Sequence, residues 1–303
     1  MRCVSRLPDV RAMGRKPLVG LLAVVATTLA GCTSSGHHEL LIASGSPGKP
    51  YNGPLYVPIV STNPYAPVLD RSGAAGRALD CIYRPYAGGR GAYHDGLLEV
   101  AATYVRAAEA FMTPNSGAFT LPPDGYRVAR HAGNRVLLSY DVRGRIKAAI
   151  ILRDGITDYQ QHTGWGVETW AVCDPAEYPA ELTDALGIGV WQDRRGRRVP
   201  VTQVESFPGD DFCDYSGVDY LQTGRYPREE FYVHDADGQL TRYLTLPYDD
   251  SSTLPEDAID TGFHRDGREL WFPPDRAAAY LVSQSDANDV QRWPGFKHTF
   301  GCG

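Results

Sequence analysis

The sequence lacks an apolar run long enough to cross a bilayer as a helix. Residues 17–30 are apolar and uncharged, but they fall short of the roughly 20 residues that a spanning helix needs. The chain also lacks a Gly-x-Ser-x-Gly elbow, a His-Glu-x-x-His helix, a Walker loop and a Gly-x-Gly-x-x-Gly motif after a strand. The common hydrolase, zinc-peptidase and nucleotide-binding classes therefore have no motif to support them, and we expect no cofactor.

Positive charge is also scarce, and only four lysines occur. The formal net charge is −6, and removal of residues 1–31, with five basic side chains and one acidic one, changes it to −10. Such a chain is a poor partner for nucleic acid or for an anionic membrane surface. There is no Cys-x-x-Cys pair, so a zinc knuckle is not expected, and we predict no metal site.

The most informative stretch is Leu29-Ala30-Gly31-Cys32, which follows the short apolar run and the basic Arg15 and Lys16. A basic segment, a short apolar segment and small residues before a cut describe a removable signal. These four residues resemble the lipobox of bacterial lipoprotein precursors. The resemblance implies cleavage before Cys32 and lipidation of its thiol, palmitate being a typical acyl chain. Two or more acyl chains anchor a protein stably, so we expect it on the outer face of the cell membrane.

Four cysteines remain in the mature part, Cys81, Cys173, Cys213 and Cys302. An even number in an exported protein predicts two disulfides, for which three connectivities are possible.

The fold class that we predict is α+β, mainly antiparallel β. After the signal peptide of residues 1–31, residues 32–50 are polar and predict a flexible tether. Residues 51–80 predict an extended lead-in, and an amphipathic pattern predicts a helix over 95–112. Strands are expected at 126–130, 135–142, 146–153, 165–173, 189–192, 199–204, 230–234, 239–246, 269–272 and 277–283, with a hairpin turn at 235–238.

The chain also contains an internal repeat. Without gaps, residues 120–137 match residues 253–270 at seven of 18 positions. Small shifts then align Ala148-Ala149 with Ala278-Ala279, Trp165 with Trp293 and Cys173 with Cys302. We therefore expect two tandem duplicated β-meander modules, 51–180 and 181–303, with one helix in the first.

The repeat favours one disulfide connectivity. Equivalent cysteines should pair inside each copy, Cys81 with Cys173 and Cys213 with Cys302.

Two histidines at matching positions, His131 and His264, are weak candidates for a binding site. They could face each other across a pseudo-two-fold axis. Alternatively, each caps a turn, with Arg135 or Arg268 paired to the aspartate of its Thr-Leu-Pro-x-Asp segment, Asp124 or Asp257.

Two further groups could bind ligands. Asp210, Asp211, Asp214 and Asp219 could hold calcium, although no EF-hand spacing supports it. The five tryptophans, Trp165, Trp170, Trp191, Trp271 and Trp293, could stack on sugars, although aromatic residues on strands usually belong to the core.

The part from about residue 51 resembles uncharacterised lipoproteins of actinobacteria. The resemblance rests on Tyr51-Asn-Gly-Pro-Leu-Tyr-Val, Cys173-Asp-Pro-Ala-Glu, Asp260-Thr-Gly-Phe, Gly267-Arg-Glu-Leu-Trp and Trp293-Pro-Gly. It implies no activity and no site residues.

These observations favour a lipid-anchored envelope protein, a non-catalytic binding or structural module whose partner is a protein or a glycan. The alternative is a membrane-tethered hydrolase acting on envelope polymers. No residue is assigned a catalytic role.

Overall fold

The structure, a computed structural model, describes residues 42–43, 45, 47–48, 50–93, 98–112, 121–209, 215–225 and 228–298. All of them belong to one folded unit, Glu39–Gly303. The predicted class is confirmed, because three antiparallel sheets dominate the described residues and helices are few and short. No helix among the described residues has the length and apolar character that a bilayer crossing requires.

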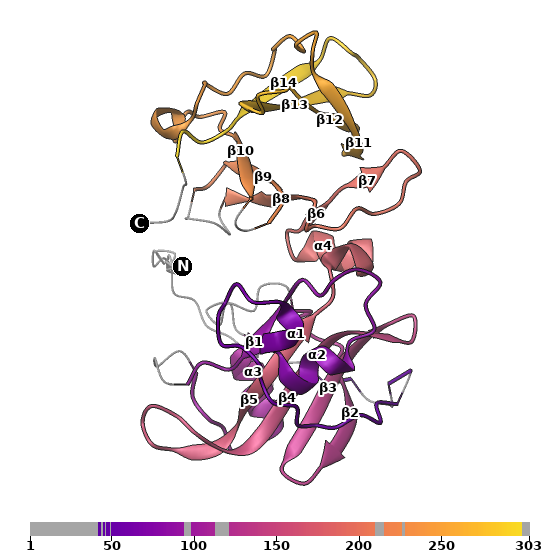
Figure 1. The fold of residues 1–303 in the computed structure, drawn as a ribbon, viewed down its shortest axis with the longest axis vertical. Helices are drawn as coiled ribbons and strands as arrows, with labels where there is room; N and C mark the ends of the chain where they lie inside the picture. The colour runs from indigo at the N-terminus through magenta and orange to yellow at the C-terminus, as the bar shows by residue number, and fades with distance from the viewer. Residues whose placement is uncertain are drawn as a thin grey trace, which may run out of the picture. The chain divides into compact units, whose positions relative to one another are not determined.

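The first sheet has five strands in the order β1-β5-β4-β3-β2 (Figure 1). They are β1 (Ala87–Arg90), β2 (Arg127–Ala132), β3 (Arg135–Val142), β4 (Arg145–Thr157) and β5 (Thr163–Val172). Two-residue turns join β2 to β3 and β3 to β4. In the second turn Arg143 and Gly144 both have positive φ, at 51° and 75°, which matches the twist of a tight hairpin.

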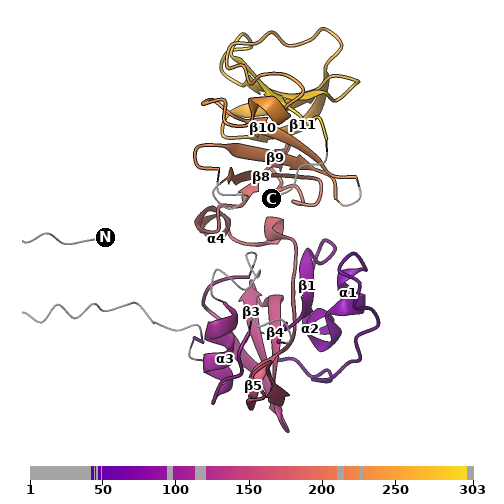
Figure 2. The ribbon, with the colours of Figure 1, turned by 90° about the vertical axis from the view of Figure 1, so that its left-hand side faces the viewer.

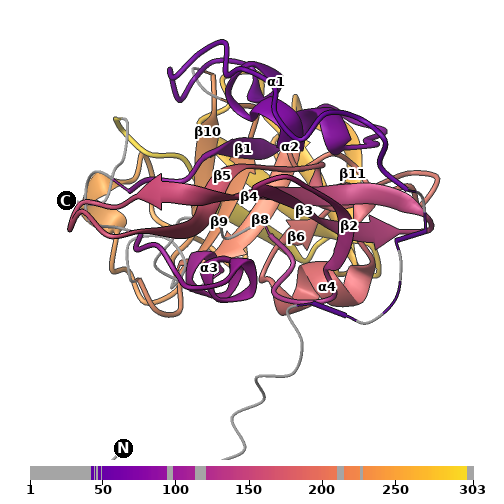
Figure 3. The same ribbon diagram turned by 90° about the horizontal axis from the view of Figure 1, so that it is seen from below.

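Both faces of this sheet are covered, because residues 146–152 of β4 are buried without interruption. Helix α3 (Tyr104–Phe111) packs on one face through Ala107, Ala108 and Phe111. Helices α1 (Val68–Arg71) and α2 (Gly73–Ala78) cover the other, where the alanines of α2 pack on β4 and β5 (Figures 2 and 3). A short 3-10 helix, η2 (Pro175–Glu177), and α4 (Ala180–Ala185) follow β5.

The rest of the chain forms two sheets that pack face to face (Figure 1). One has the order β10-β9-β8-β6 and the other β14-β13-β12-β11-β7. Trp191, Val204, Leu221, Leu270 and Trp293 belong to the buried cluster between them. The strands are β6 (Gly189–Val190), β7 (Gln192–Asp193), β8 (Val204–Pro208), β9 (Asp219–Thr223), β10 (Glu230–His234), β11 (Ile259–Arg265), β12 (Arg268–Phe272), β13 (Ala278–Ser283) and β14 (Val290–Pro294).

The predicted duplication is present in the strand pairing. In the first meander, His131 lies opposite Val136 across β2 and β3. The residues 133 positions later, His264 and Glu269, lie opposite each other across β11 and β12. Both ladders also contain a register shift in their first strand.

The third strands keep the correspondence. Ile151 lies opposite Leu137 in the first meander, and Leu281 lies opposite Leu270 in the second. Equivalent residues of the third strands are 130 positions apart, which is also the spacing between Ala148-Ala149 and Ala278-Ala279. Strands β2 to β5 and β11 to β14 therefore share one order, and their first three strands share the register beside the first hairpin and between the second and third strands.

The predicted equivalence breaks down in the fourth strand. In the second copy Trp293 lies opposite Ala279. In the first copy the equivalent alanine, Ala149, lies opposite Ala171, so the counterpart of Trp293 is Ala171 and not Trp165. Trp165 instead bridges to Ala101, before α3. The copies also take their fifth strands at opposite edges, with β1 beside β5 but β7 beside β11.

The helix predicted over 95–112 is shorter than expected. Residues 95–97 lie outside the described part, and 98–103 are not helical. Ala101 exchanges two backbone hydrogen bonds of 2.8 Å with Trp165, which holds this segment extended. The helix begins after Thr103, whose side chain accepts a hydrogen bond from Arg106 N at 3.3 Å.

Three other predictions are wrong in detail. The lead-in of residues 51–80 contains α1 and α2, because the small residues of 73–78 fit closely against the sheet. Residues 201–203 turn, because the Asp174 carboxylate accepts from Val201 N, and β8 begins only at Val204. Residues 239–246 include a 3-10 helix, η4 (Thr241–Tyr243), in place of a strand and hairpin. The Asp235 carboxylate accepts from two successive backbone N–H groups, at 239 and 240, and curls the chain there.

The Cys81–Cys173 disulfide is confirmed, with 5.4 Å between the two Cα atoms. It joins the segment before β1 to the end of β5. Cys32, Cys213 and Cys302 lie outside the described residues, so lipidation and the second disulfide stay predictions.

Candidate functional site

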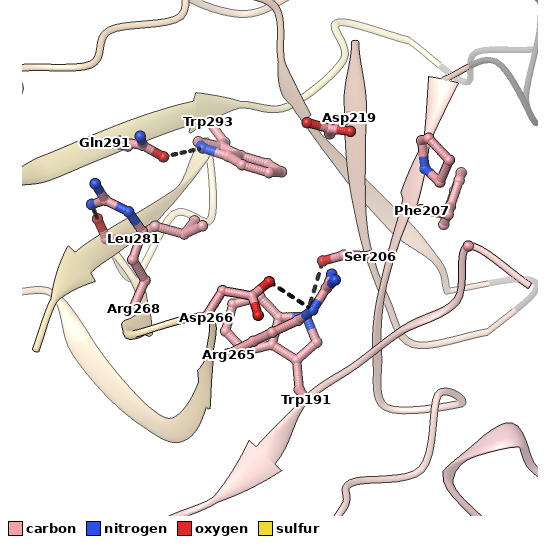
Figure 4. A pocket seen from close by; sticks show the side chains of 12 residues that line it. Trp191, Ser206, Phe207, Asp219, Arg265, Asp266, Arg268, Leu281, Gln291 and Trp293 are labelled. Carbon is pink, nitrogen blue, oxygen red and sulfur yellow. Dashed lines mark hydrogen bonds and ion pairs between the residues drawn. The ribbon is translucent and has the colours of Figure 1, made fainter. Parts of the chain in front are cut away.

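A cavity of about 300 Å³ opens at one end of the two packed sheets. Figure 4 shows the side chains that converge on it from β8, β9, β11, β12, β13 and β14. The lining residues are Gly187, Trp191, Ser206, Phe207, Pro208, Asp219, Arg265, Asp266, Arg268, Leu281, Gln291 and Trp293. Its size lies at the lower end of the range for small-molecule sites.

Two tryptophans give the cavity its apolar surface. Trp191 and Trp293 are 2% and 8% exposed and belong to the core between the sheets. Trp191 Nε1 donates to Ser206 Oγ at 3.0 Å, and Trp293 Nε1 donates to Gln291 Oε1 at 3.2 Å. Each indole is therefore held in place by a polar side chain that also lines the cavity.

Asp219 provides the acidic side of the cavity. Its Oδ2 lies 3.4 Å from Nδ1 of His234, its cross-strand neighbour on β10. The His234 ring packs between Tyr248 and Trp293, with centroid distances of 4.6 and 5.2 Å. The Asp219 side chain remains 53% exposed, so it can accept hydrogen bonds from a ligand.

Serine, histidine and aspartate thus occur near one cavity, but their contacts do not form a catalytic triad. A triad requires a hydrogen bond between the hydroxyl and the imidazole. Within the described part of the chain, the Ser206 hydroxyl bonds only to Trp191, and His234 contacts Asp219. His234 is also absent from the cavity lining. The contacts of the described residues therefore do not assemble a Ser–His–Asp triad at this cavity.

A larger cavity, of about 450 Å³, opens at the other end of the sheets. Its charged groups mostly satisfy one another. The Arg276 guanidinium donates to Glu230 Oε2 at 2.5 Å and to Thr223 Oγ1 at 3.1 Å, and it stacks on Phe272. We therefore place the candidate site in the cavity with the two tryptophans.

The two candidate histidines are not brought together. His131 is exposed at the end of β2, near the rings of Tyr104 and Trp165. His264 lines a separate polar cavity of about 250 Å³ beside α4. Among the described residues no ring contact, hydrogen bond or ion pair joins the two histidines.

The predicted arginine–aspartate pairs are also wrong. Arg135 donates to both carboxylate oxygens of Glu168, at 2.6 and 2.8 Å, not to Asp124. Arg268 donates to both oxygens of Asp289, each at 3.0 Å, not to Asp257. In both copies the arginine reaches across its sheet toward the fourth strand, so the repeat preserves a structural ion pair.

The remaining candidate residues are the four aspartates and the five tryptophans. Asp210, Asp211 and Asp214 lie outside the described residues, and Asp219 belongs to the cavity. Trp165, Trp170 and Trp271 are half-buried against apolar clusters, as the core interpretation predicts.

Sequence reasoning missed Ser206, Arg265 and Gln291. They stand on three strands that are distant in the chain, and no local motif links them. The position of Arg265 directly after His264 was the one available signal.

A second polar cluster, made of Tyr86, Glu205 and Arg225, is buried beside β8. The Tyr86 hydroxyl donates to Glu205 Oε2 at 3.1 Å, and the Arg225 guanidinium lies 4.0 Å from the Tyr86 ring. Burial raises the pKa of Glu205 to about 7, although the Tyr86 hydrogen bond and the charge of Arg225 lower it. Burial also raises the pKa of Asp174, whose carboxylate accepts from the backbone of 176, 201 and 202. These bonds tie the end of the first meander to the next segment.

No protein family, curated protein or solved structure matches this chain. The function must therefore be argued from the site.

Proposed function

We propose that this chain is a non-catalytic binding module of the bacterial cell envelope, lipid-anchored through Cys32 on the outer face of the cell membrane. The observation that carries the binding role is the cavity between the two sheets. It combines two tryptophans with a serine, a glutamine, two aspartates and two arginines, a mixture of apolar and polar groups that small-ligand sites use. The lipobox residues support the location.

The ligand is part of an envelope polymer, because a tethered protein meets such polymers at high local concentration. The shared chemistry is that of a glycan, whose ring carbons pack on indoles and whose hydroxyls bond to serine, amide and carboxylate groups.

Co-sedimentation with insoluble envelope polysaccharide tests the binding role. We expect the full-length chain to be retained, and the Asp219→Asn/Gln291→Ala variant to lose most of that retention. A matched control makes the same exchanges at exposed residues outside the cavity, Asp257→Asn and Gln284→Ala, and should bind like the wild type. Equal retention of both variants, or no retention of the wild type, would refute the role of the cavity.

Labelling with an alkyne-bearing fatty acid tests the anchor. The wild type should carry the label in the membrane fraction, and Cys32→Ser should carry none. A labelled Cys32→Ser protein would place the lipid elsewhere.

A further inference from the structure

Two arginines line the cavity, and they differ in how many of their donors have partners among the described residues. The Arg268 guanidinium is fully engaged, because it bonds to both carboxylate oxygens of Asp289 and to the Leu281 carbonyl. The Arg265 guanidinium instead donates no hydrogen bond to a described residue, and its Nε forms an ion pair with Asp266 Oδ2 at 3.1 Å. The Asp266 side chain is 79% exposed, so water weakens this pair.

The Arg265 guanidinium lies against strand β6 at Gly189, which has no side chain. A Cβ on Gly189 would lie 1.9 Å from Arg265 Nη1 and 2.5 Å from Cζ. Gly189 lies opposite Ser206 in the β6–β8 ladder, and Figure 4 shows the guanidinium beside Ser206 and Trp191. The absence of a side chain at 189 therefore lets the arginine lie against the wall of the cavity.

The other polar side chains of the cavity can each form further hydrogen bonds. Ser206 Oγ accepts from Trp191, so its own proton remains available to donate. Gln291 Oε1 accepts from Trp293, so its amide N–H groups remain available. Asp219 offers acceptor oxygens on another part of the lining. A ring with several hydroxyls would use all three.

We propose that this cavity binds a single sugar ring that carries a carboxylate, with the carboxylate on the Arg265 guanidinium. A planar guanidinium matches a carboxylate with two parallel hydrogen bonds, and such charge-assisted bonds are about twice as strong as neutral ones. Ser206, Gln291 and Asp219 bond to hydroxyls of the ring, and the small exposed part of Trp293, 8% of the residue, contacts its carbons. This inference rests on the proposed function and names the ligand class of the same site.

Calorimetric titration of the full-length chain, in a detergent without a sugar headgroup, tests the proposal. The probes are glucuronate, galacturonate, glucose, galactose, acetate and inorganic phosphate. We expect at least one uronate to bind at least tenfold more tightly than its neutral counterpart, and more tightly than acetate or phosphate. Arg265→Gln should remove that preference, so that the uronate and its neutral counterpart bind this variant alike.

Two further variants sharpen the test. Arg265→Lys keeps the charge but not the planar fork, so part of the preference should survive. Arg106→Gln removes an arginine that is 71% exposed on α3, and it should bind like the wild type.

Equal binding of uronate and neutral sugar, an unchanged preference in Arg265→Gln, or phosphate binding as tight as uronate binding would overturn the inference. If neutral sugars bind and the Asp219→Asn/Gln291→Ala protein loses them, the proposed binding role stands while the acidic ligand does not. If none of the sugars binds but envelope material still retains the chain, the inference fails and the proposed function survives. If no envelope material is retained either, both fail.

Discussion

Lys147 Nζ lies 2.6 Å from Glu177 Oε2, and the two side chains are only 3% and 1% exposed. Lys147 also donates to the Asp80 carbonyl at 2.6 Å, and Glu177 accepts from the backbone N–H groups of Ile82 and Tyr83. The pair thus connects β4, the 3-10 helix after β5 and the segment around Cys81. Its hydrogen bonds satisfy both charges, which a buried ion pair needs.

Removing one partner should destabilise the protein strongly. Lys147→Met leaves the Glu177 carboxylate buried without its cation, and we expect a loss of about 3–5 kcal/mol in the free energy of unfolding. Urea unfolding measures it. Lys147→Met/Glu177→Gln should recover part of the loss, because the amide oxygen still accepts from residues 82 and 83. Breaking the exposed Arg106–Glu109 pair with Arg106→Ala should cost no more than about 1 kcal/mol. Similar losses at both pairs would contradict the assigned role of Lys147.

The neighbouring disulfide should contribute a comparable amount. Cys81 and Cys173 are separated by 92 positions, and closing a loop of that length in the unfolded chain is worth about 4 kcal/mol. Cys81→Ala/Cys173→Ala should therefore unfold at clearly lower urea concentration, and dithiothreitol should produce at least the same shift in the wild type, because it also reduces the predicted Cys213–Cys302 bond. An unchanged midpoint in both experiments would show that the disulfide constrains little.

The raised pKa of Glu205 predicts how the free energy of unfolding depends on pH. Its pKa of about 7 in the folded protein lies above the ordinary 4.5, so folding favours the protonated carboxyl. Stability should then fall as pH rises from about 4.5 to about 7 and stay low above that. Glu205→Gln keeps an acceptor for Tyr86 and removes the charge. It should stabilise the protein at pH 8 by up to about 3 kcal/mol, at 1.36 kcal/mol for each pKa unit, and change little at pH 4. A constant difference between wild type and variant from pH 4 to pH 8 would refute this assignment.

Thiol counting tests the second predicted disulfide. If Cys213 pairs with Cys302, and Cys32 is lipidated, the unfolded but unreduced protein should react with no alkylating agent, and reduction should expose four thiols by mass spectrometry. Two free thiols before reduction would leave Cys213 and Cys302 unpaired.

The regular parts of the fold could be predicted because their patterns are local. Residues 135–142 form a strand over the expected bounds, since apolar residues lie between two tight turns. Identical residues at a fixed spacing also revealed the second meander and, through it, the Cys81–Cys173 pair. The predictions failed where a hydrogen bond from the backbone to a carboxylate decided the local shape. Asp174 turns residues 201–203 and Asp235 turns residues 239–240, and neither bond can be read from strand propensity.

The candidate site could not be predicted for a related reason. Ser206, Asp219, Arg265 and Gln291 converge only when two sheets pack, and the space for the arginine depends on Gly189 of a fifth segment. His264 was noticed because the repeat preserves it, but the repeat marks what both copies need to fold. Arg265 has Ala132 as its counterpart, so the repeat gives no signal for the arginine itself.

The outer strands β1 and β7 lie at opposite edges of their sheets, so neither belongs to the strand pairing that the two meanders share. Natural variation and engineered insertions should accordingly be tolerated at β1 and β7 far more readily than at the shared hairpins.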